Sequence, residues 1–253
     1  MKITFLGTGT SQGIPVISCG CAVCHSDDFR DNRLRTSILM ETEDRTIVID
    51  SGPDFRYQML RARVHDLDAI IYTHEHKDHI AGLDDIRPYN YLQHKDIEVY
   101  ATVRVQEALE KEFSYIFAAK KYPGIPQINI HTITDQNFFI GETEIIPLDI
   151  MHYKLPILGF RINDFTYITD AKTVPQHTID KIRGTKVLVI NALQIEEHIS
   201  HFTLDEAIAF AELIGAETTY FTHISHNLGK HADVKALLPA NIRLAYDGMI
   251  INV

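Results

Sequence analysis

The sequence contains the stretch His-Glu-His-Lys-Asp-His, which begins at His74 and carries four candidate metal ligands. Residues 69–72, just before it, are apolar or aromatic and predict a buried strand. Because side chains alternate along an extended chain, His74 and His76 point the same way. Asp78 and His79 follow where the chain is expected to turn into a short helix. From there they can reach a second metal position close to the first. Neutral imidazoles and carboxylates suit divalent cations, so the stretch predicts half of the ligands of two neighbouring metal ions rather than a polar surface loop.

Three further candidate ligands, His152, Asp170 and His223, each follow an apolar stretch that predicts a strand. Ligands from distant parts of a sequence converge where strand ends meet at one edge of a sheet. Taken singly, each of the three could be a cap or a surface residue. Together with the first stretch they make up the set that a dinuclear centre needs.

The three cysteines of the chain, Cys19, Cys21 and Cys24, lie within six residues of one another. An odd and tightly clustered set is not a disulfide framework. It predicts a metal site in a reducing compartment, with three reduced free cysteines as the alternative.

The elements that must position these residues follow from the hydrophobic pattern and the turn residues. Strands are expected at 2–6, 37–41, 46–50, 69–72, 97–100, 128–133, 137–140, 143–149, 157–162, 165–169, 186–190, 217–222, 242–246 and 249–252. Helices are expected at 55–63, 103–119, 175–183, 203–214 and 231–237. Residues 84–95 are expected to be irregular and to form a wall of the site. Strands interleaved with helices in both halves predict two mixed β-sheets covered by helices, in one α/β domain that spans residues 1–253.

Composition and charge restrict the class of protein. The chain has 253 residues, 45% of them hydrophobic and 23% charged, as is ordinary for a globular protein. We expect a cytoplasmic protein without a membrane partner, because neither a long apolar run nor a leader sequence is evident. A net charge of −10 argues against a protein that grips long nucleic acid. It does not exclude a small anionic substrate, because bound metal ions invert the local potential.

Several motifs together resemble a known group of enzymes. The His-x-His-x-Asp-His stretch resembles the signature of the metallo-β-lactamase superfamily of hydrolases. The glycine-rich loop at 7–15, the Cys-x-Cys-x-x-Cys motif at 19–24 and the segments 222–226 and 246–249 are similar to those of the PhnP subfamily of cyclic-phosphate phosphodiesterases. The tRNase Z and PqqB lineages share parts of this pattern. The resemblance implies a metallo-β-lactamase-type αββα four-layer sandwich.

The resemblance also implies roles for individual residues. One metal ion is assigned to His74, His76 and His152. The other is assigned to Asp78, His79 and His223, with Asp170 bridging the two ions and Asp50 supporting the site from outside it. The ions would be manganese or zinc, and the ligand types do not decide between them. Asp78 and Asp170 would act in catalysis through these ions, which lower the pKa of a shared water and clamp the phosphoryl oxygens.

The cysteines and His226 are the ligands of a closed tetrahedral zinc site, which we predict to be structural. His223 and His226 are three residues apart, so one short turn can serve both sites. His25 is a rival fourth ligand, disfavoured because it adjoins Cys24.

Protonation of the leaving oxygen is assigned to His201, whose position matches a proposed general acid of the PhnP subfamily, with His198 as the rival. Arg87 and Lys154 lie beside ligand-bearing segments and could bind phosphate. For both of them, a structural or solvated charge is an equal alternative.

The resulting prediction is a metal-dependent phosphodiesterase that hydrolyses a small phosphodiester, a cyclic sugar phosphate, through a hydroxide activated by two metal ions. A tRNase Z-like nuclease and a PqqB-like non-catalytic accessory protein are the alternatives. The sequence leaves the exact substrate and the formation of a homodimer open.

Overall fold

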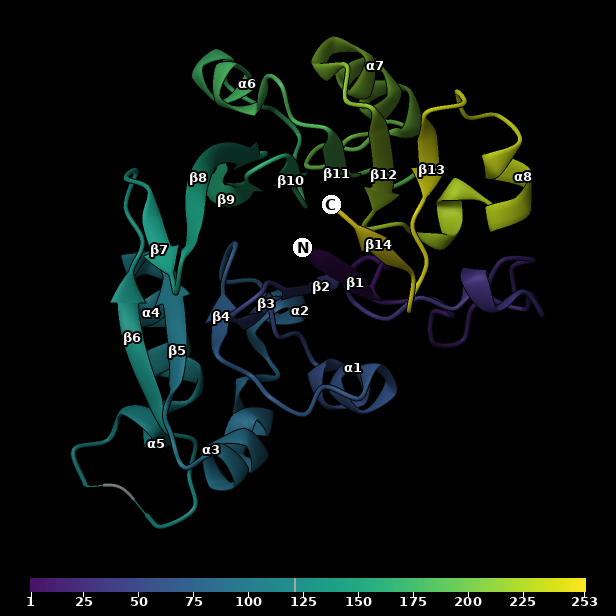
Figure 1. The fold of residues 1–253 in the computed structure, drawn as a ribbon. Coiled ribbons are helices and arrows are strands. Elements are labelled where there is room, and N and C mark those ends of the chain that lie inside the picture. The colour runs from purple at the N-terminus through teal and green to yellow at the C-terminus, as the bar shows by residue number, and fades with distance from the viewer. Residues whose placement is uncertain (121) are drawn as a thin grey trace.

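The computed structural model describes residues 1–120 and 122–253, and it contains two seven-stranded β-sheets. The strand order is β14-β1-β2-β3-β4-β5-β6 in the first sheet and β13-β12-β11-β10-β9-β8-β7 in the second. Each sheet is mixed, with antiparallel pairs in one half and parallel pairs in the other. The two sheets lie face to face with helices on their outer sides (Figure 1).

The first sheet is built mainly from the N-terminal half of the chain. Its strands are β1 (Lys2–Gly7), β2 (Ser37–Glu41), β3 (Thr46–Ile49), β4 (Ala69–Ile71), β5 (Ile97–Ala101), β6 (Ile128–Thr132) and β14 (Ile250–Asn252). The associated helices are α1 (Phe55–Ala62), α2 (Lys77–Ile80), α3 (Arg87–Gln93), α4 (Val103–Glu112) and α5 (Ser114–Phe117). Short 3-10 helices lie at Phe29–Asp31 and Leu83–Ile86.

The second sheet comes from the C-terminal half. Its strands are β7 (Phe138–Ile140), β8 (Thr143–His152), β9 (Leu155–Ile162), β10 (Phe165–Tyr167), β11 (Val187–Asn191), β12 (Thr218–Thr222) and β13 (Ile242–Leu244). The helices are α6 (Gln176–Ile182), α7 (Leu204–Ile214) and α8 (His231–Lys235), with a 3-10 helix at His226–Leu228. Helix α7 begins with the predicted capping box, in which Thr203 and Glu206 each bond to the other's backbone N–H.

Three apolar layers hold the four structural layers together. One layer packs α1, α3 and α4 onto the first sheet, and a second packs α6, α7 and α8 onto the second sheet. The third lies between the sheets, where side chains such as Phe5 and Ile38 meet Phe160 and Tyr220. The predicted αββα sandwich is therefore confirmed, and the one-domain organisation stays a prediction.

Two local predictions were wrong. Residues 84–95 are not irregular, because Pro88 stands in the first turn of α3, where its missing N–H costs nothing. The helix expected at 103–119 is broken at Phe113, which has φ −117° and ψ 43°. Elsewhere the expected elements are present with ends shifted by a few residues. Among the described residues, no helix is long and apolar enough to cross a membrane.

Candidate dinuclear centre and cysteine site

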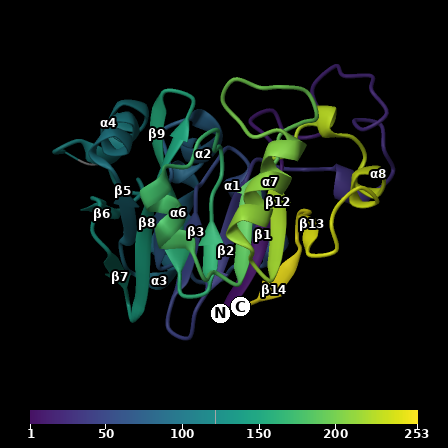
Figure 2. The ribbon, with the colours of Figure 1, turned by 90° about the horizontal axis from the view of Figure 1, so that it is seen from above.

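The candidate ligands of the dinuclear centre gather at the carboxyl ends of parallel strands. Asp50 follows β3, the predicted ligand stretch follows β4, Asp170 follows β10 and His223 follows β12. The chain termini lie at the opposite end of the sheets from α2 (Figure 2). Asp50, Asp170 and His223 all have left-handed backbones, with φ of 65°, 57° and 53°. This conformation is costly outside glycine and is found at turns, helix ends and functional sites; here it turns the side chains out of the strand direction.

Four of the predicted ligands, Asp78, His79, Asp170 and His223, have donor atoms that all lie within 4.8 Å of one another. Asp78 Oδ2 is 3.2 Å from His79 Nε2 and 3.9 Å from His223 Nε2. Asp170 Oδ2 is 3.6 Å from His79 Nε2 and 3.3 Å from His223 Nε2. Ligand atoms at about 2.0–2.1 Å from one tetrahedral ion stand roughly 3.4 Å apart. These separations therefore suit a shared divalent cation.

The other predicted set, His74, His76 and His152, lies directly beside this group. The ring centroids are 4.6 Å apart for His74 and His76, 5.2 Å for His76 and His152, and 5.9 Å for His74 and His152. His74 Nε2 lies 3.1 Å from His76 Nδ1 and 3.8 Å from Asp170 Oδ2. Asp170 thus stands between the two sets. His152 is the last residue of β8 itself, because that strand continues three residues beyond the expected end.

In His152 and His79, hydrogen bonds to one ring nitrogen leave the other ring nitrogen available to bind a metal ion. His152 Nδ1 is 2.9 Å from the carbonyl oxygens of Asp170 and Ser200, so this nitrogen carries the proton and donates. His79 Nδ1 donates to Asp50 Oδ2 at 2.7 Å. In the neutral form of either ring the lone pair is then on Nε2, the atom that a metal ion would bind. Asp50 consequently occupies the supporting position predicted for it, one bond away from a ligand.

The buried carboxylates and imidazoles perturb one another strongly. Burial alone would raise the pKa of Asp170, but His223 and His79 hold it well below its usual value. Burial would lower the pKa of His79, but Asp170, Asp50 and Asp78 raise it well above the usual value. Burial lowers the pKa of His74 well below its usual value, with His79 contributing. In the metal-free chain a proton on His79 therefore offsets part of the negative charge of the neighbouring carboxylates.

The donor set fits metal ions. His79 Nε2 and both ring nitrogens of His223 are buried and have no hydrogen-bond partner among the described residues. Leaving such atoms unpaired is costly, and native proteins do so rarely. A divalent cation between the imidazoles and the two carboxylates would satisfy the Nε2 atoms together. The cluster could therefore hold metal ions through His and Asp side chains.

His201, the predicted acid, is buried against two predicted ligands. Its ring centroid is 4.6 Å from that of His152 and 4.8 Å from that of His223. His198, the rival, is less buried and lies 5.1 Å from His201. Burial and the neighbouring His223 lower the pKa of His201 to about 2. The ring is therefore neutral in the metal-free chain, and an anion bound beside it would raise that pKa.

The cysteine site is assembled as predicted, with His226 rather than His25 pointing at the sulfurs. His226 Nδ1 lies 3.3 Å from Cys19 Sγ, 3.4 Å from Cys21 Sγ and 3.7 Å from Cys24 Sγ. Tetrahedral zinc, with bonds of about 2.3 Å to sulfur and about 2.0 Å to nitrogen, holds such atoms roughly 3.5 Å apart. The backbone N–H of Cys24 and the His226 ring lower the pKa of Cys21 to about 6. The four residues fit a closed zinc site with no position left for substrate.

The glycine-rich loop supports the segment that carries both His223 and His226. Gly9 forms a parallel bridge with Ile224, and Thr10 N–H donates to the Ile224 carbonyl at 3.0 Å. A Cβ on Gly9 would lie 2.9 Å from the backbone oxygen of Arg33. The glycine is therefore required for close packing of backbone segments.

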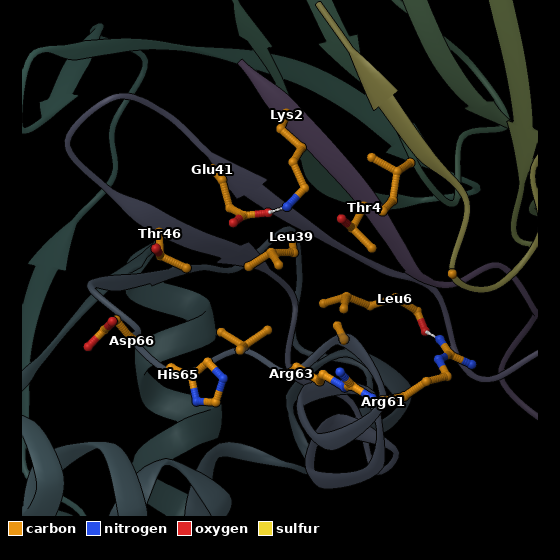
Figure 3. Close-up of a pocket in the computed structure, with 14 residues that line it drawn as sticks. Lys2, Thr4, Leu6, Leu39, Glu41, Thr46, Arg61, Arg63, His65 and Asp66 are labelled. Atoms are coloured by element: carbon orange, nitrogen blue, oxygen red, sulfur yellow. Dashed lines mark hydrogen bonds and ion pairs between the residues drawn. The ribbon is translucent and has the colours of Figure 1, made fainter.

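The two proposed phosphate-binding side chains lie in different places. Lys154 is at the β8–β9 turn, two residues after His152, with its ammonium 5.2 Å from the Tyr153 ring centre. Arg87 is at the start of α3, where its Nη2 lies 2.6 Å from Asp84 Oδ2. The contacts of Arg87 thus favour its structural alternative. A surface pocket of about 390 Å³ between β1, β2 and the end of α1 contains basic residues, but Lys2 is paired with Glu41 there and Arg61 with Leu6 and Asp247 (Figure 3).

Sequence reasoning missed the residues that orient the ligands. Thr73 donates its hydroxyl to Asp50 Oδ2 at 2.8 Å and lies 3.0 Å from His74 Nδ1. Thr36 Oγ1 accepts the His223 N–H at 3.2 Å. A hydroxyl next to a ligand motif could have flagged Thr73. Thr36 lies 187 residues from His223, so nothing in the local sequence connects the two.

Comparisons with known proteins agree with this geometry. The model of the beta-lactamase superfamily domain matches residues 45–224. A solved structure described as a new diphosphatase from the PhnP family is 38% identical, with a TM-score of 0.93 over 99% of this chain and 96% of that chain. The octanoyltransferase of Porphyromonas gingivalis is 38% identical over 98% of this chain but only 51% of that protein. The chain spans about half the length of the first curated relatives it matches.

A more distant neighbour supports the fold alone. Zinc-bound PqqB from Methylobacterium extorquens is 17% identical, with a TM-score of 0.81 and full coverage of both chains. The match to the superfamily domain and the likeness to the PhnP-family diphosphatase over nearly the whole chain fix the membership. This chain therefore belongs to the beta-lactamase superfamily, as a PhnP-family hydrolase with the metallo-β-lactamase fold.

Proposed function

We propose that this protein is a metal-dependent phosphodiesterase that hydrolyses a small phosphodiester, a five-membered cyclic phosphate on a sugar. The observation that carries the proposal is the convergence of two carboxylates and five imidazoles at one sheet edge, with His201 against them. His74, His76 and His152 would hold one divalent cation, and Asp78, His79 and His223 the other, with Asp170 between them. Manganese and zinc both suit these ligands.

The reaction needs a nucleophile, charge neutralisation and a proton for the leaving group. Two bound cations would lower the pKa of a water and offset the phosphoryl charge. The water would lose a proton to solvent and its oxygen would bond to phosphorus as the bond from phosphorus to one sugar oxygen breaks. His201, having taken up a proton from solvent, would donate it to that sugar oxygen. The anionic phosphate beside His201 raises its pKa toward the range that a general acid requires.

The charge of the chain favours a compact substrate. The net charge of −10 disfavours a polynucleotide. The PhnP-family relative described as a diphosphatase supports hydrolysis of a phosphorus–oxygen bond.

The test is a substrate panel, run with manganese and with zinc on the metal-loaded full chain. It contains a ribose cyclic phosphate, an aryl phosphodiester, a phosphomonoester, a diphosphate and a tRNA precursor. We expect turnover of the cyclic and aryl diesters and little of the monoester. Cleavage of the tRNA precursor alone would support the tRNase Z-like alternative. Turnover of the diphosphate alone would make the protein a diphosphatase, and no turnover with either metal would favour an accessory protein.

A further inference from the structure

Where β10 separates from β11, the side chain of Asn191 makes the hydrogen bonds that backbone groups make between the strands before that point. The strands pair from Phe165 with Val187 to Tyr167 with Val189, and Ile168 N–H still donates to the Val189 carbonyl at 2.9 Å. Two residues further on, the Asn191 side chain continues the contact. Its Oδ1 accepts the Ala171 N–H at 2.7 Å, and its Nδ2 donates to the Ala171 carbonyl at 3.0 Å.

This contact lies immediately after Asp170, which leaves the strand with a φ of 57°. A left-handed aspartate persists only where the surroundings hold it, because the conformation is costly. The neighbouring peptide groups are buried and must be paired. A side-chain amide offers one acceptor and two donors, so it can imitate the peptide group of a missing strand neighbour. Asn191 is itself fully buried, at 0% exposure.

The segment that Asn191 holds is also hydrogen-bonded to His152 and to the residue after His201. The Ala171 carbonyl that accepts from Asn191 also accepts the N–H of Phe202 at 2.8 Å, and Phe202 follows His201. The Asp170 carbonyl, one peptide earlier, accepts from His152 Nδ1 at 2.9 Å. On its other side, the Asn191 backbone pairs with Thr222, next to His223. The three neighbouring strands β10, β11 and β12 are visible side by side in Figure 1.

We propose that Asn191 is a positioning residue of the dinuclear centre, which fixes Asp170, and through its backbone His152 and His201, in the geometry that metal binding requires. The inference rests on the proposed metal-dependent function. Loss of either hydrogen bond of the Asn191 side chain loosens the Ala171 peptide group. The Asp170 carboxylate, which is predicted to bridge the ions, then samples other orientations. Metal affinity and kcat fall as a result, while KM changes little because Asn191 touches no substrate.

The test compares three variants by metal affinity, kinetics and thermal melting. Asn191→Asp keeps one oxygen acceptor and removes the donor, and Asn191→Leu removes both. Asn90→Asp is the matched control, because Asn90 makes the same pair of bonds, at 3.0 and 2.8 Å, to the N–H and carbonyl of Gln127 on the far side of the first sheet. Affinity for Mn²⁺ is measured by competition with a chelator, and kcat and KM with an aryl phosphodiester.

We expect Asn191→Asp and Asn191→Leu to weaken Mn²⁺ binding and lower kcat by roughly 10–100-fold, with zinc retained at the cysteines. Asn90→Asp should change melting temperature but neither metal affinity nor kcat. Equal affinities in all variants, or failure of Asn191→Asp to fold, would overturn the proposal and leave Asn191 a structural residue. Failure of the wild-type chain itself to bind Mn²⁺ or Zn²⁺ at the cluster would instead overturn the proposed function.

Discussion

The dinuclear centre and the cysteine site share one short segment, with His223 in the first and His226 in the second, yet they are built differently. The ligands of the centre follow sheet strands, and His79, Asp170 and His223 are no more than 2% exposed. All four residues of the cysteine site are half-buried; the three cysteines come from a loop, and His226 begins a short 3-10 helix. Hydrogen bonds donated to Asp50 and to backbone carbonyls orient the imidazoles of His79 and His152. The strands and their hydrogen bonds therefore hold the first site, whereas we expect a bound metal to contribute more to holding the second.

The loop that carries the cysteines has little regular structure of its own. In residues 8–36, all of which the structure describes, the only helix or strand is the 3-10 turn Phe29–Asp31. Buried polar contacts attach the loop to the C-terminal part of the chain. Arg33 donates to the Ala245 carbonyl at 2.6 Å, and Asp31 accepts the His231 N–H at 2.7 Å. A zinc ion would add a further link of this kind, from Cys19, Cys21 and Cys24 to His226.

The largest effect should come from Asp170→Ala and His76→Ala. Each removes a ligand of the proposed centre, so turnover should fall by about four orders of magnitude or more. The melting temperature of the metal-free protein should change little, because the strands, not the ions, hold this site. Asp180→Ala, an exposed carboxylate on α6, is the control and should be fully active. Normal turnover in a variant that has lost its metal would refute the two-metal account.

A smaller loss is expected for His201→Ala, which removes the proposed proton donor and none of the seven predicted metal ligands. A donor atom of His201 does lie within 4.8 Å of those of His152 and Asp170. The rate on a ribose cyclic phosphate should fall by roughly 10²–10⁴-fold, because a sugar alkoxide is a poor leaving group. An aryl diester should lose much less, because phenolate leaves without a proton. Equal losses on both substrates would make His201 a phosphate contact. A differential loss in His198→Ala instead would move the acid role to His198.

Cys21→Ser should have the opposite effect to the ligand variants of the dinuclear centre. It should lower stability strongly and turnover only slightly. Loss of the zinc should lower the free energy of unfolding by at least about 2 kcal/mol, or roughly 4–8 °C in melting temperature. Turnover per folded molecule should fall less than about tenfold. His25→Ala is the control, since His25 faces the Cys21 carbonyl and not the sulfurs. The comparison breaks down if Cys21→Ser melts like the wild type.

The smallest effect should come from Thr36→Val, at the contact that positions the segment shared by both sites. The variant removes the acceptor of the His223 N–H and the bond to the Thr222 hydroxyl at 3.1 Å. The two lost buried hydrogen bonds should together cost about 1–2 kcal/mol of stability. Metal affinity of the centre should fall a few-fold by chelator competition, while zinc at the cysteines is unchanged. Equal weakening of both metals would mean that the two sites are coupled through this segment.

Motif spacing carried much of the prediction. The αββα fold was predicted and is confirmed, and the structure brings all seven predicted ligands of the centre together with His201. Their roles stay predictions. The sequence located Asp170 and His223 because each follows an apolar strand, and parallel strand ends meet at one edge. It located the cysteine site from three cysteines within six residues.

What the sequence could not give depends on tertiary contacts. Asn191 ends an apolar strand, as many residues do. Its amide has hydrogen-bond partners only because β10 separates from β11 near Asp170. Thr36 meets His223 across the interface of the two sheets. Arg87 was chosen for its charge beside a ligand-bearing segment, but the helix that begins there directs it to Asp84. Short-range pattern carries no information on such partners.

The most direct test of the difference between the two sites is a count of metal ions per chain by elemental analysis, before and after gentle chelation, with X-ray absorption at the zinc edge. We predict three ions per chain before chelation. Afterwards one zinc should remain, bound by three sulfurs and one nitrogen, and the chelated protein should be folded but inactive until Mn²⁺ or Zn²⁺ is restored. Zinc without sulfur ligands, or full activity in the chelated protein, would contradict the account.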